Sequence, residues 1–418
     1  MRIIRKLTEE DFKQYVPIIQ SAFPGTRFDL PDTCGSLRER FAQAHEQDTS
    51  SEFYGLFEDE TLLGSMRLHN YTMNVFSHLL PVGGVGLVAV DIMRKKEKVG
   101  RDLLSYFLRY FRDRGVSITL LNPFRVDFYK QMGFGVGTKI NQYRVNPGQF
   151  HNRGTKKHIV RVTERDHELV FACYQRYMER QHGMIAKTDM EARLMFANPD
   201  YHTVAYKKDD KIEGYLVFSF KRLCPEDNFS ASDLIVNELI YETAEAFAEL
   251  CTFLSSQADQ IHRVIVNTQE EDFHHLLTDP SNGYDNLLPG SNIQMHTSGV
   301  GAMYRVIHVA KLFADLSNHN FGGKTLTVEI RVQDKFLPEN QENTLVHFQE
   351  GRASVLTEGT PDVTIELDIA DFSSLIMGSI SFQKLLDYSL VKVSNPTFEK
   401  DLDQLFHAVQ KPICTASF

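Results

Sequence analysis

Several apolar segments in the first 150 residues have the lengths and patterns of β-strands. Residues 2–7 combine apolar and basic positions, and two strand-like segments within 53–69 surround a Glu-Asp-Glu turn. The run VGLVAV (85–90) is apolar without interruption, as in a strand that is buried on both faces. The run VSITLLNP (116–123) is similar. Together these segments predict a sheet.

Between these segments, apolar residues recur at the spacing of a helix. One series follows a start signal made by Thr8 and Asp11 and continues to about Phe23. A second series begins at Val99 and ends at Gly115, a residue type that is common just after a helix. A short helix is predicted after 116–123, before the segment GFGVG. Strands that alternate with helices predict an α/β domain ending near residue 150.

The same order of elements recurs after a polar linker, HNRGTKKH (151–158). A strand, a threonine start signal and an amphipathic helix come first, and 203–220 repeats the strand pair of 53–69. A strand-plus-helix segment follows in 230–257. The basic cluster and the glycine that precede the first copy of this helix are missing here. The pattern predicts a degenerate internal duplication over 151–290.

The remaining residues form a third pattern, which starts near Tyr304. It contains a short helix (309–316), alternating strands such as TLTVEIRV and DVTIELDI, and two amphipathic helices at about 370–388 and 396–410. Strands grouped before helices are typical of an α+β domain. The predicted domains are therefore 1–150, 151–290 and 291–418.

The composition fits a globular protein of several domains. The chain has 418 residues, more than one hydrophobic core usually holds, with 42% apolar and 24% charged residues. Its formal charge of −10 argues against nucleic-acid binding, which needs a basic surface. An acidic surface could also attract a cationic substrate.

The cysteines and the apolar runs indicate where the protein works. Five cysteines form no pair with zinc-site spacing, and an odd number without a disulfide pattern is typical of a reduced cytoplasm. No metal site is therefore expected. The N-terminal segment lacks the apolar core of a signal peptide, and no apolar run reaches the roughly 20 residues of a membrane helix. We expect a cytoplasmic protein that does not bind a membrane.

The segment VAVDIMRKKEKVGRDLL (88–104) carries the strongest chemical signal. A buried strand leads directly into a helix, whose first N–H groups have no intrahelical partner. These donors, the helix dipole and the neighbouring lysines and arginines could bind a phosphate or pyrophosphate. A small residue such as Gly100 would let a cofactor approach the backbone. The alternative is an ordinary solvated basic surface.

This segment resembles motif A of the GNAT acetyltransferases, V-x-V-x-P-x-x-(Q/R)-x-x-G-x-(G/A). Val88 and Val90 match the strand positions, Lys95 the Q/R position and Gly100 the final small residue. Ile92 replaces the proline, and Lys98 replaces the first glycine. A lysine fits at position 98 if its φ is negative and its side chain points outward.

A second segment, NPFRVDFYKQMGFGVG (122–137), resembles the GNAT helix that ends in Y-x-x-x-G-(F/Y). The matching residues are Tyr129, Gly133 and Phe134. The resemblance implies that Tyr129 lies near the sulfur of coenzyme A and protonates the leaving thiolate. A phenol with a pKa of about 10 stays protonated at neutral pH and can donate. Taken alone, Tyr129 would be interpreted as a half-buried core residue.

The arrangement of the whole chain resembles the Eis (enhanced intracellular survival) acetyltransferases, which have two GNAT domains and a domain similar to sterol carrier proteins. The resemblance implies transfer of acetyl groups from acetyl-CoA to amines of aminoglycosides, and assembly as hexamers. It also implies that the C-terminal carboxylate, here that of Phe418, is the catalytic base. A frayed terminus is the alternative for Phe418. Gly25 and Ser417 stand where family members carry acids.

The resemblance also assigns the remaining site residues. The strand backbone of Val88, Ala89 and Val90 would pair with the pantetheine, and Phe23 would lie in the acceptor pocket. Phe124 and Arg125 would lie beside the cofactor, where the family has a Ser-Glu pair. The residues that would surround the pyrophosphate are Lys96, Glu97, Lys98, Val99, Gly100 and Arg101.

Three other functions remain open. The chain could acetylate protein lysines or polyamines, it could be an inert lipid carrier led by its third domain, or it could be a structural assembly partner. An open channel in the third domain would favour the carrier. Tyr129 and the basic turn argue against an inert partner, because an inert domain needs neither of them.

Overall fold

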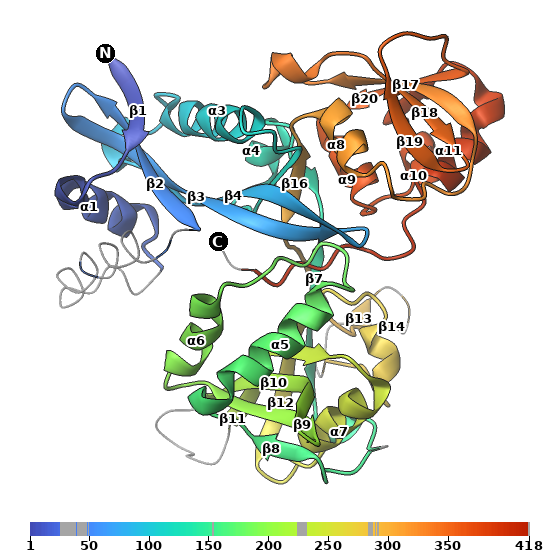
Figure 1. Cartoon of the computed structure of the whole chain (residues 1–418). Coiled ribbons are helices and arrows are strands. Elements are labelled where there is room, and N and C mark those ends of the chain that lie inside the picture. The colour runs from blue at the N-terminus through green and yellow to red at the C-terminus, as the bar shows by residue number, and fades with distance from the viewer. Residues whose placement is uncertain are drawn as a thin grey trace. The chain divides into compact units, whose positions relative to one another are not determined.

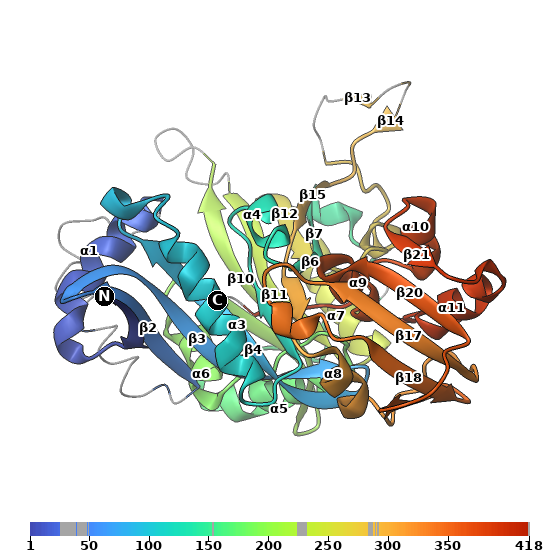
Figure 2. The same cartoon turned by 90° about the horizontal axis from the view of Figure 1, so that it is seen from above.

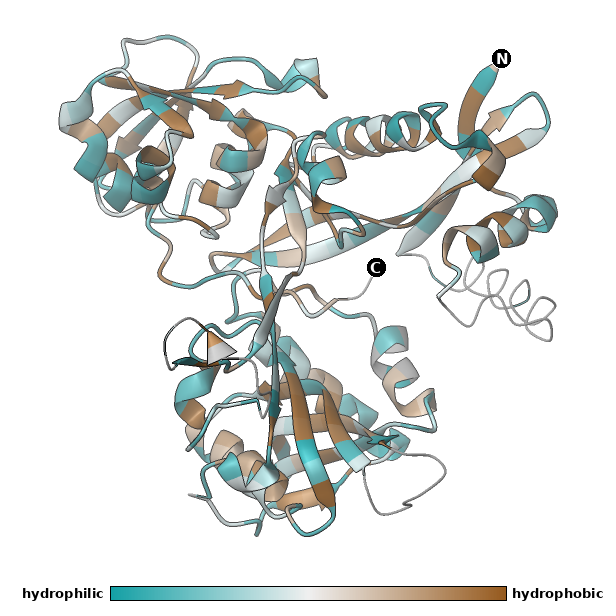
Figure 3. Cartoon of the chain, turned by 180° about the vertical axis from the view of Figure 1, so that it is seen from behind, coloured by the Kyte–Doolittle hydropathy of each residue, from teal (hydrophilic) through white to brown (hydrophobic). Residues whose placement is uncertain are grey.

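The computed structural model describes residues 1–25, 39, 48, 50–152, 154–223, 232–282, 287–288, 290 and 292–416. The chain forms two compact units. Unit 1 contains residues 1–137, 302–411 and 416–418, and unit 2 contains residues 138–301 and 412–415. Hydrophobic residues are concentrated on the strands of both units (Figure 3). No helix among the described residues is long and apolar enough to cross a membrane.

The first sheet of unit 1 has the strand order β1-β2-β3-β4-β5-β16-β6 among the described residues. Figure 1 shows its strands β1, β2, β3, β4 and β16. Strands β4 and β5 are parallel, whereas the other neighbours are antiparallel. The strands are β1 (Arg2–Lys6), β2 (Ser51–Glu58), β3 (Thr61–Val75), β4 (His78–Val90), β5 (Ile118–Leu121), β6 (Gly135–Val136) and β16 (Met303–Val306).

Two helices cover opposite faces of this sheet. Phe53 and Phe57 of β2 pack in a cluster with α1 (Phe12–Ala22), whereas Tyr54 and Leu56 pack with α3 (Val99–Arg112). Successive residues of a strand point to opposite faces, so the two clusters lie on either side of the sheet. The 3-10 turns η1 (Glu9–Asp11) and η4 (Ile92–Arg94) and the short helix α4 (Val126–Lys130) complete the domain.

The third domain also belongs to unit 1. Its sheet has the order β19-β18-β17-β20-β21, and β17, β18 and β20 lie side by side (Figure 2). The predicted α+β fold is confirmed, with strands followed by helices. The elements are α8 (Val309–Asp315), β17 (Leu326–Gln333), η8 (Pro338–Asn340), β18 (Thr344–Gln349), β19 (Arg352–Leu356), β20 (Val363–Asp368), α9 (Ile369–Ile376), α10 (Phe382–Asp387), β21 (Val391–Val393), η9 (Pro396–Phe398) and α11 (Glu399–Leu405).

Unit 2 repeats the plan of the first domain, as the sequence predicts. Both copies begin with a strand and a reciprocal capping box, formed by Thr8 with Asp11 and by Thr163 with Asp166. The described sheet has the order β15-β7-β12-β11-β10-β9-β8. The elements are β7 (Lys139–Val145), η5 (Pro147–Gln149), β8 (Ile159–Arg161), η6 (Glu164–Asp166), α5 (His167–Met178), α6 (Asp189–Ala197), β9 (His202–Lys208), β10 (Lys211–Arg222), β11 (Ser232–Tyr241), α7 (Ala244–Ser255), β12 (Ile261–Thr268), η7 (Phe273–Leu276), β13 (Leu287–Leu288), β14 (Asn292–Ile293) and β15 (Thr297–Val300).

The expected domain boundaries do not coincide with those of the compact units. Strand β7 pairs with β12, so the chain enters unit 2 after Gly137 rather than near 150. It returns to unit 1 at Ala302, because β16 pairs with β5 and β6 of the first sheet. The expected start of the third domain at 291, and the third sequence pattern beginning near Tyr304, therefore fall before the third-domain sheet.

Local structure differs from the expectation at three further places. The predicted strand 85–90 is the end of a longer strand, β4, which forms a hairpin with β3. The predicted helix at 370–388 is two helices, α9 and α10, because Gly378 takes a left-handed φ of 72° between them. The paired strands β18 and β19 were not predicted.

A buried ion pair joins the first sheet to the third domain within unit 1. Arg305 of β16 donates from Nη2 to both carboxylate oxygens of Asp334, each at 2.9 Å, and both side chains are fully buried. The same carboxylate accepts bonds from the backbone N–H of Leu337 and from the Asn340 side chain. Nε and Nη1 of Arg305 have no hydrogen-bond partner among the described residues.

We expect the variant Arg305→Met to lose about 3 kcal/mol of unfolding free energy or more, because it leaves the Asp334 carboxylate buried without its counter-charge. Arg109→Met is the matched control, since the Arg109–Glu339 pair of the same unit is half exposed and should contribute less than about 1 kcal/mol. The measurement is the urea midpoint of both variants. Equal midpoints would contradict the expectation.

Candidate functional site

The predicted cofactor strand has an open edge. Strands β4 and β5 pair through Gly83 with Thr119 and through Gly84 with Leu120. β4 then continues to Val90, and no described strand pairs with its residues 85–90 on the β5 side. An extended ligand with amide groups can bind to such an edge as an added strand. The predicted residues 88–90 lie in this stretch.

A β-bulge lies within the same stretch. Ser65 pairs with Ala89 and Arg67 with Gly86, so two residues of β4, Leu87 and Val88, stand opposite one residue of β3. Leu87 has a left-handed φ of 47°. A bulge redirects the backbone groups and side chains of its strand, and bulges are common beside active sites. Because leucine rarely takes this conformation, the sequence contains no signal for it.

The first turn of α3, the helix that follows β4, has no side-chain cap among the described residues and can bind an anion through its backbone N–H groups. Its N-cap residue, Lys98, makes no side-chain capping bond within the described structure. The Asp102 N–H donates to the Lys98 carbonyl at 2.9 Å. The corresponding helix of unit 2, α7, is capped by the Thr243 hydroxyl, which accepts from the Ala246 N–H at 3.2 Å. The uncapped first turn therefore distinguishes the first domain from its copy.

The loop before α3 has a strained backbone. Lys96 has a φ of 69° and Lys98 a φ of 65°, in the left-handed region that favours glycine. The negative φ that we gave as the condition for a lysine at position 98 is therefore not observed. The chain takes the conformation of the motif glycine at this position with a side chain attached, and such strain is common at functional sites.

The side chains of this loop divide into two groups. Lys95, Lys96, Lys98 and Arg101 are exposed. The Glu97 carboxylate instead pairs with Arg94 and with Arg2 of β1. Glu97 thus lies in the predicted pyrophosphate loop, and its side chain is already paired with basic residues. Sequence reasoning missed Arg2, because only the fold brings the first strand to this loop.

The structure brings most of the predicted cofactor residues together. A Cβ atom at Gly100 would lie 3.6 Å from Val90 and 3.9 Å from Phe128. The Phe128 ring contacts that of Tyr129, and the exposed Phe124 ring contacts both, with centroids 5.2–5.7 Å apart. The start of α3, the end of β4 and helix α4 therefore meet at one place.

Tyr129 and Arg125 have different environments there. Tyr129 is 3% exposed, and burial raises the pKa of its phenol above the usual value, so the group is protonated at neutral pH. Arg125 is exposed, and its guanidinium forms two bonds of 2.6–2.7 Å with Asp127. The Arg125 charge is therefore partly neutralised beside the site.

Phe23 lies on the other face of the sheet. It is the residue after α1, and it packs, together with Leu87, against the cluster that contains Ala89. Phe23 therefore belongs to the face opposite α3. Phe418 lies outside the described residues, and the last described residue, Ala416, accepts a 3.5 Å contact from the Asn122 side chain in the loop before α4.

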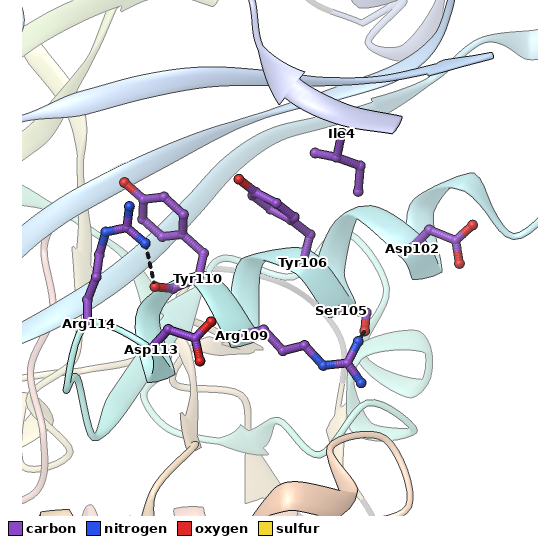
Figure 4. Close-up of a pocket in the computed structure, with 8 residues that line it drawn as sticks. All are labelled: Ile4, Asp102, Ser105, Tyr106, Arg109, Tyr110, Asp113 and Arg114. Carbon is purple, nitrogen blue, oxygen red and sulfur yellow. Dashed lines mark hydrogen bonds between the residues drawn. The ribbon is translucent and has the colours of Figure 1, made fainter. Parts of the chain in front are cut away.

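A separate pocket of about 500 Å³ lies along α3 (Figure 4). It contains none of the predicted site residues. Among the described residues, no group of three or more His, Cys, Asp or Glu is placed to hold a metal. The residues that line the pocket are Ile4, Asp102, Ser105, Tyr106, Arg109, Tyr110, Asp113 and Arg114.

Comparisons with known families agree with this architecture. Residues 3–137 match the acetyltransferase (GNAT) domain, residues 155–306 match a second acetyltransferase (GNAT) domain family, and residues 313–415 match the sterol carrier protein domain. None of the curated proteins matches the sequence. The chain therefore contains two GNAT acetyltransferase domains, a class of domain whose cosubstrate is acetyl-CoA.

Several solved structures share the fold of this chain. Three of them match over 100% of both chains: a GCN5-related N-acetyltransferase from Anabaena variabilis (17% identity, TM-score 0.82), a probable N-acyltransferase from Enterococcus faecalis (19%, 0.80) and Eis1 from Mycobacterium abscessus (19%, 0.77). The fold is thus Eis-like, with two GNAT domains and a sterol carrier domain, as the sequence predicts.

The strain at Lys98 can be measured with two variants that remove the same charge. Lys98→Gly relieves the left-handed backbone and Lys98→Ala does not, so we expect Lys98→Gly to be the more stable by about 1 kcal/mol. Thermal unfolding of both variants is the measurement. Identical stability would mean that the backbone at this position is not strained.

Proposed function

We propose that the protein transfers the acetyl group of acetyl-CoA to an amine of a polycationic acceptor such as an aminoglycoside. The observation that carries the proposal is the meeting of an open β4 edge, an uncapped helix start and Tyr129. The open edge fits a pantetheine, and the helix start with its lysines fits a pyrophosphate. The formal charge of −10 favours a cationic acceptor.

In the proposed reaction, the amine attacks the thioester directly. Backbone N–H groups of Val88–Val90 polarise the thioester carbonyl, and Tyr129 donates its proton to the departing thiolate. The terminal carboxylate of Phe418 accepts the proton of the amine. A thiol nucleophile is not needed, and Cys414 is 4% exposed, which does not suit that role.

The described part of the C-terminal tail supports a role for Phe418. In unit 2, the Gln269 side chain donates to the Cys414 carbonyl at 2.6 Å and accepts from its N–H at 2.7 Å. In unit 1, Ala416 contacts Asn122, in the loop that also carries Phe124. Two further residues can span at most about 7 Å. A terminus held in this way is not free to fray at Cys414.

The lipid-carrier alternative is less well supported. The third domain has buried phenylalanines at 313, 348, 372, 382 and 406. A hollow among Phe321, Leu375 and Phe406 has a cavity volume of about 10 Å³, which is room for about one water molecule rather than a lipid. Acetylation of protein lysines or polyamines remains the alternative acceptor class, and the family resemblance supports a homo-oligomer, a hexamer.

The first test is release of coenzyme A from acetyl-CoA with a kanamycin-type amine, a lysine peptide, or no acceptor. We expect release that depends on the aminoglycoside. Release with the peptide alone would favour the alternative acceptor class, and no acceptor-dependent release at all would overturn the enzyme function proposed for this site.

Tyr129→Phe is expected to lower kcat between about 100-fold and 10,000-fold, the usual contribution of a general acid. The ring and its contacts with Phe124 and Phe128 remain, so the KM for acetyl-CoA should change little. The measurement is steady-state kinetics with acetyl-CoA varied. An unchanged kcat would remove Tyr129 from the mechanism.

Removal of Phe418 is expected to lower turnover strongly and to leave the affinity for acetyl-CoA nearly intact, because only the proposed base is lost. The matched control is Phe418→Leu, which retains a terminal carboxylate and an apolar side chain. Calorimetric titration gives the affinity and the release assay gives the turnover. Full activity of the shortened chain would rule out the terminal carboxylate as the base.

A further inference from the structure

Arg2, in the first strand of the sheet, contacts the pyrophosphate loop proposed above. Its Nη1 donates to the Glu97 carbonyl at 2.9 Å, and its Nη2 donates to the Glu97 carboxylate at 3.1 Å. The guanidinium also lies 3.8 Å from the Asp102 carboxylate and 3.3 Å from that of Glu58. One arginine therefore holds both the backbone and the side chain of a single loop residue.

The residue that Arg2 holds lies between the two strained positions of the loop. Lys96 and Lys98 have φ values of 69° and 65°, and Glu97 stands between them. Non-glycine residues keep a left-handed backbone only when their surroundings enforce it. The contacts of Glu97 with Arg94 are longer: its N–H donates to the Arg94 carbonyl at 3.4 Å, and its carboxylate lies 3.7 Å from the Arg94 guanidinium.

The charges near the loop give Arg2 a second effect. Glu97 and Asp102 bring two carboxylates next to the start of α3, where an anionic pyrophosphate would bind. These carboxylates repel an anionic pyrophosphate and so disfavour its binding. Arg2 pairs with both carboxylates, and the lysines of the loop then remain exposed and available to the ligand.

We infer that Arg2 is a positioning residue for the cosubstrate: it holds the loop 95–98 in the conformation that leaves the first N–H groups of α3 open to the pyrophosphate of acetyl-CoA. The inference rests on the proposed acetyl-CoA site. Arg2 acts through Glu97 and Asp102 and does not touch the ligand. Because the ion pairs of Arg2 are partly exposed, we expect their loss to change the global stability little and to act mainly on the conformation of the loop.

The test compares two acetyl donors, acetyl-CoA and S-acetylpantetheine, which lacks the pyrophosphate. We expect Arg2→Ala to lower kcat/KM for acetyl-CoA about tenfold, the size of one charge-assisted hydrogen bond, and to leave kcat/KM for S-acetylpantetheine unchanged. Arg2→Lys should lie in between, because an ammonium cannot bind the carbonyl and the carboxylate of Glu97 as a planar fork does.

Arg5→Ala is the matched control. Arg5 lies in the same strand and forms bonds of 2.6 and 2.8 Å with Asp11, away from the loop. Its removal should not change the preference of the enzyme between the two donors. The melting temperatures of all variants are measured in parallel, and that of Arg2→Ala should stay within a few degrees of the wild type.

The outcomes separate the inference from the function on which it rests. Equal losses with both donors, or no loss with either, would overturn the role of Arg2 while the acetyl-CoA site stands. A wild-type protein that uses neither donor would overturn the proposed function and the inference with it. A loss confined to acetyl-CoA supports both.

Discussion

The structure of unit 1 depends on one buried ion pair. Arg305 reaches from β16 to Asp334 of the third domain, and both charges are removed from water, so each is tolerated only because the other is present. The pair also determines what can lie beside it. A Cβ atom at Gly133 would come within 1.8 Å of the Arg305 guanidinium, which is why a glycine is needed in the turn after Tyr129. The third domain thus supports the segment that carries the proposed general acid.

The two GNAT copies differ at the place where we propose the cosubstrate site. In the first copy, the connection between β4 and α3 is long enough for a basic loop, and the helix start is left uncapped. In the second, β11 is followed after two residues by α7, where the Thr243 hydroxyl accepts from the Ala246 N–H. The cap occupies one of the donors of this first turn, and a turn of two residues is too short to surround a phosphate. The difference is one of loop length and capping, not of fold.

Most elements with a regular apolar pattern could be predicted, because burial on one face leaves a period in the sequence. The helix beginning at Val99 and the repeated capping boxes are examples. Long-range pairing leaves no such period. Strand β16 carries nothing that assigns it to β5, so a domain boundary was expected before it. The candidate site divides in the same way. Tyr129 and Gly100 belong to local motifs, whereas the bulge at Leu87 and the approach of Arg2 arise only when distant strands meet.

The third domain packs against the first sheet within unit 1. A lipid carrier needs a cavity, whereas the described core of the third domain is filled by aromatic side chains. Its helix α9 contacts the first sheet directly: the Ser374 hydroxyl donates to the Val136 carbonyl, and the Ser373 hydroxyl accepts from the Val306 N–H. These bonds replace strand pairing at the β6 and β16 side of the sheet, next to the turn after Tyr129. A sterol-carrier fold therefore serves here as a rigid cover for a sheet edge, which needs close packing and would be weakened by a lipid channel.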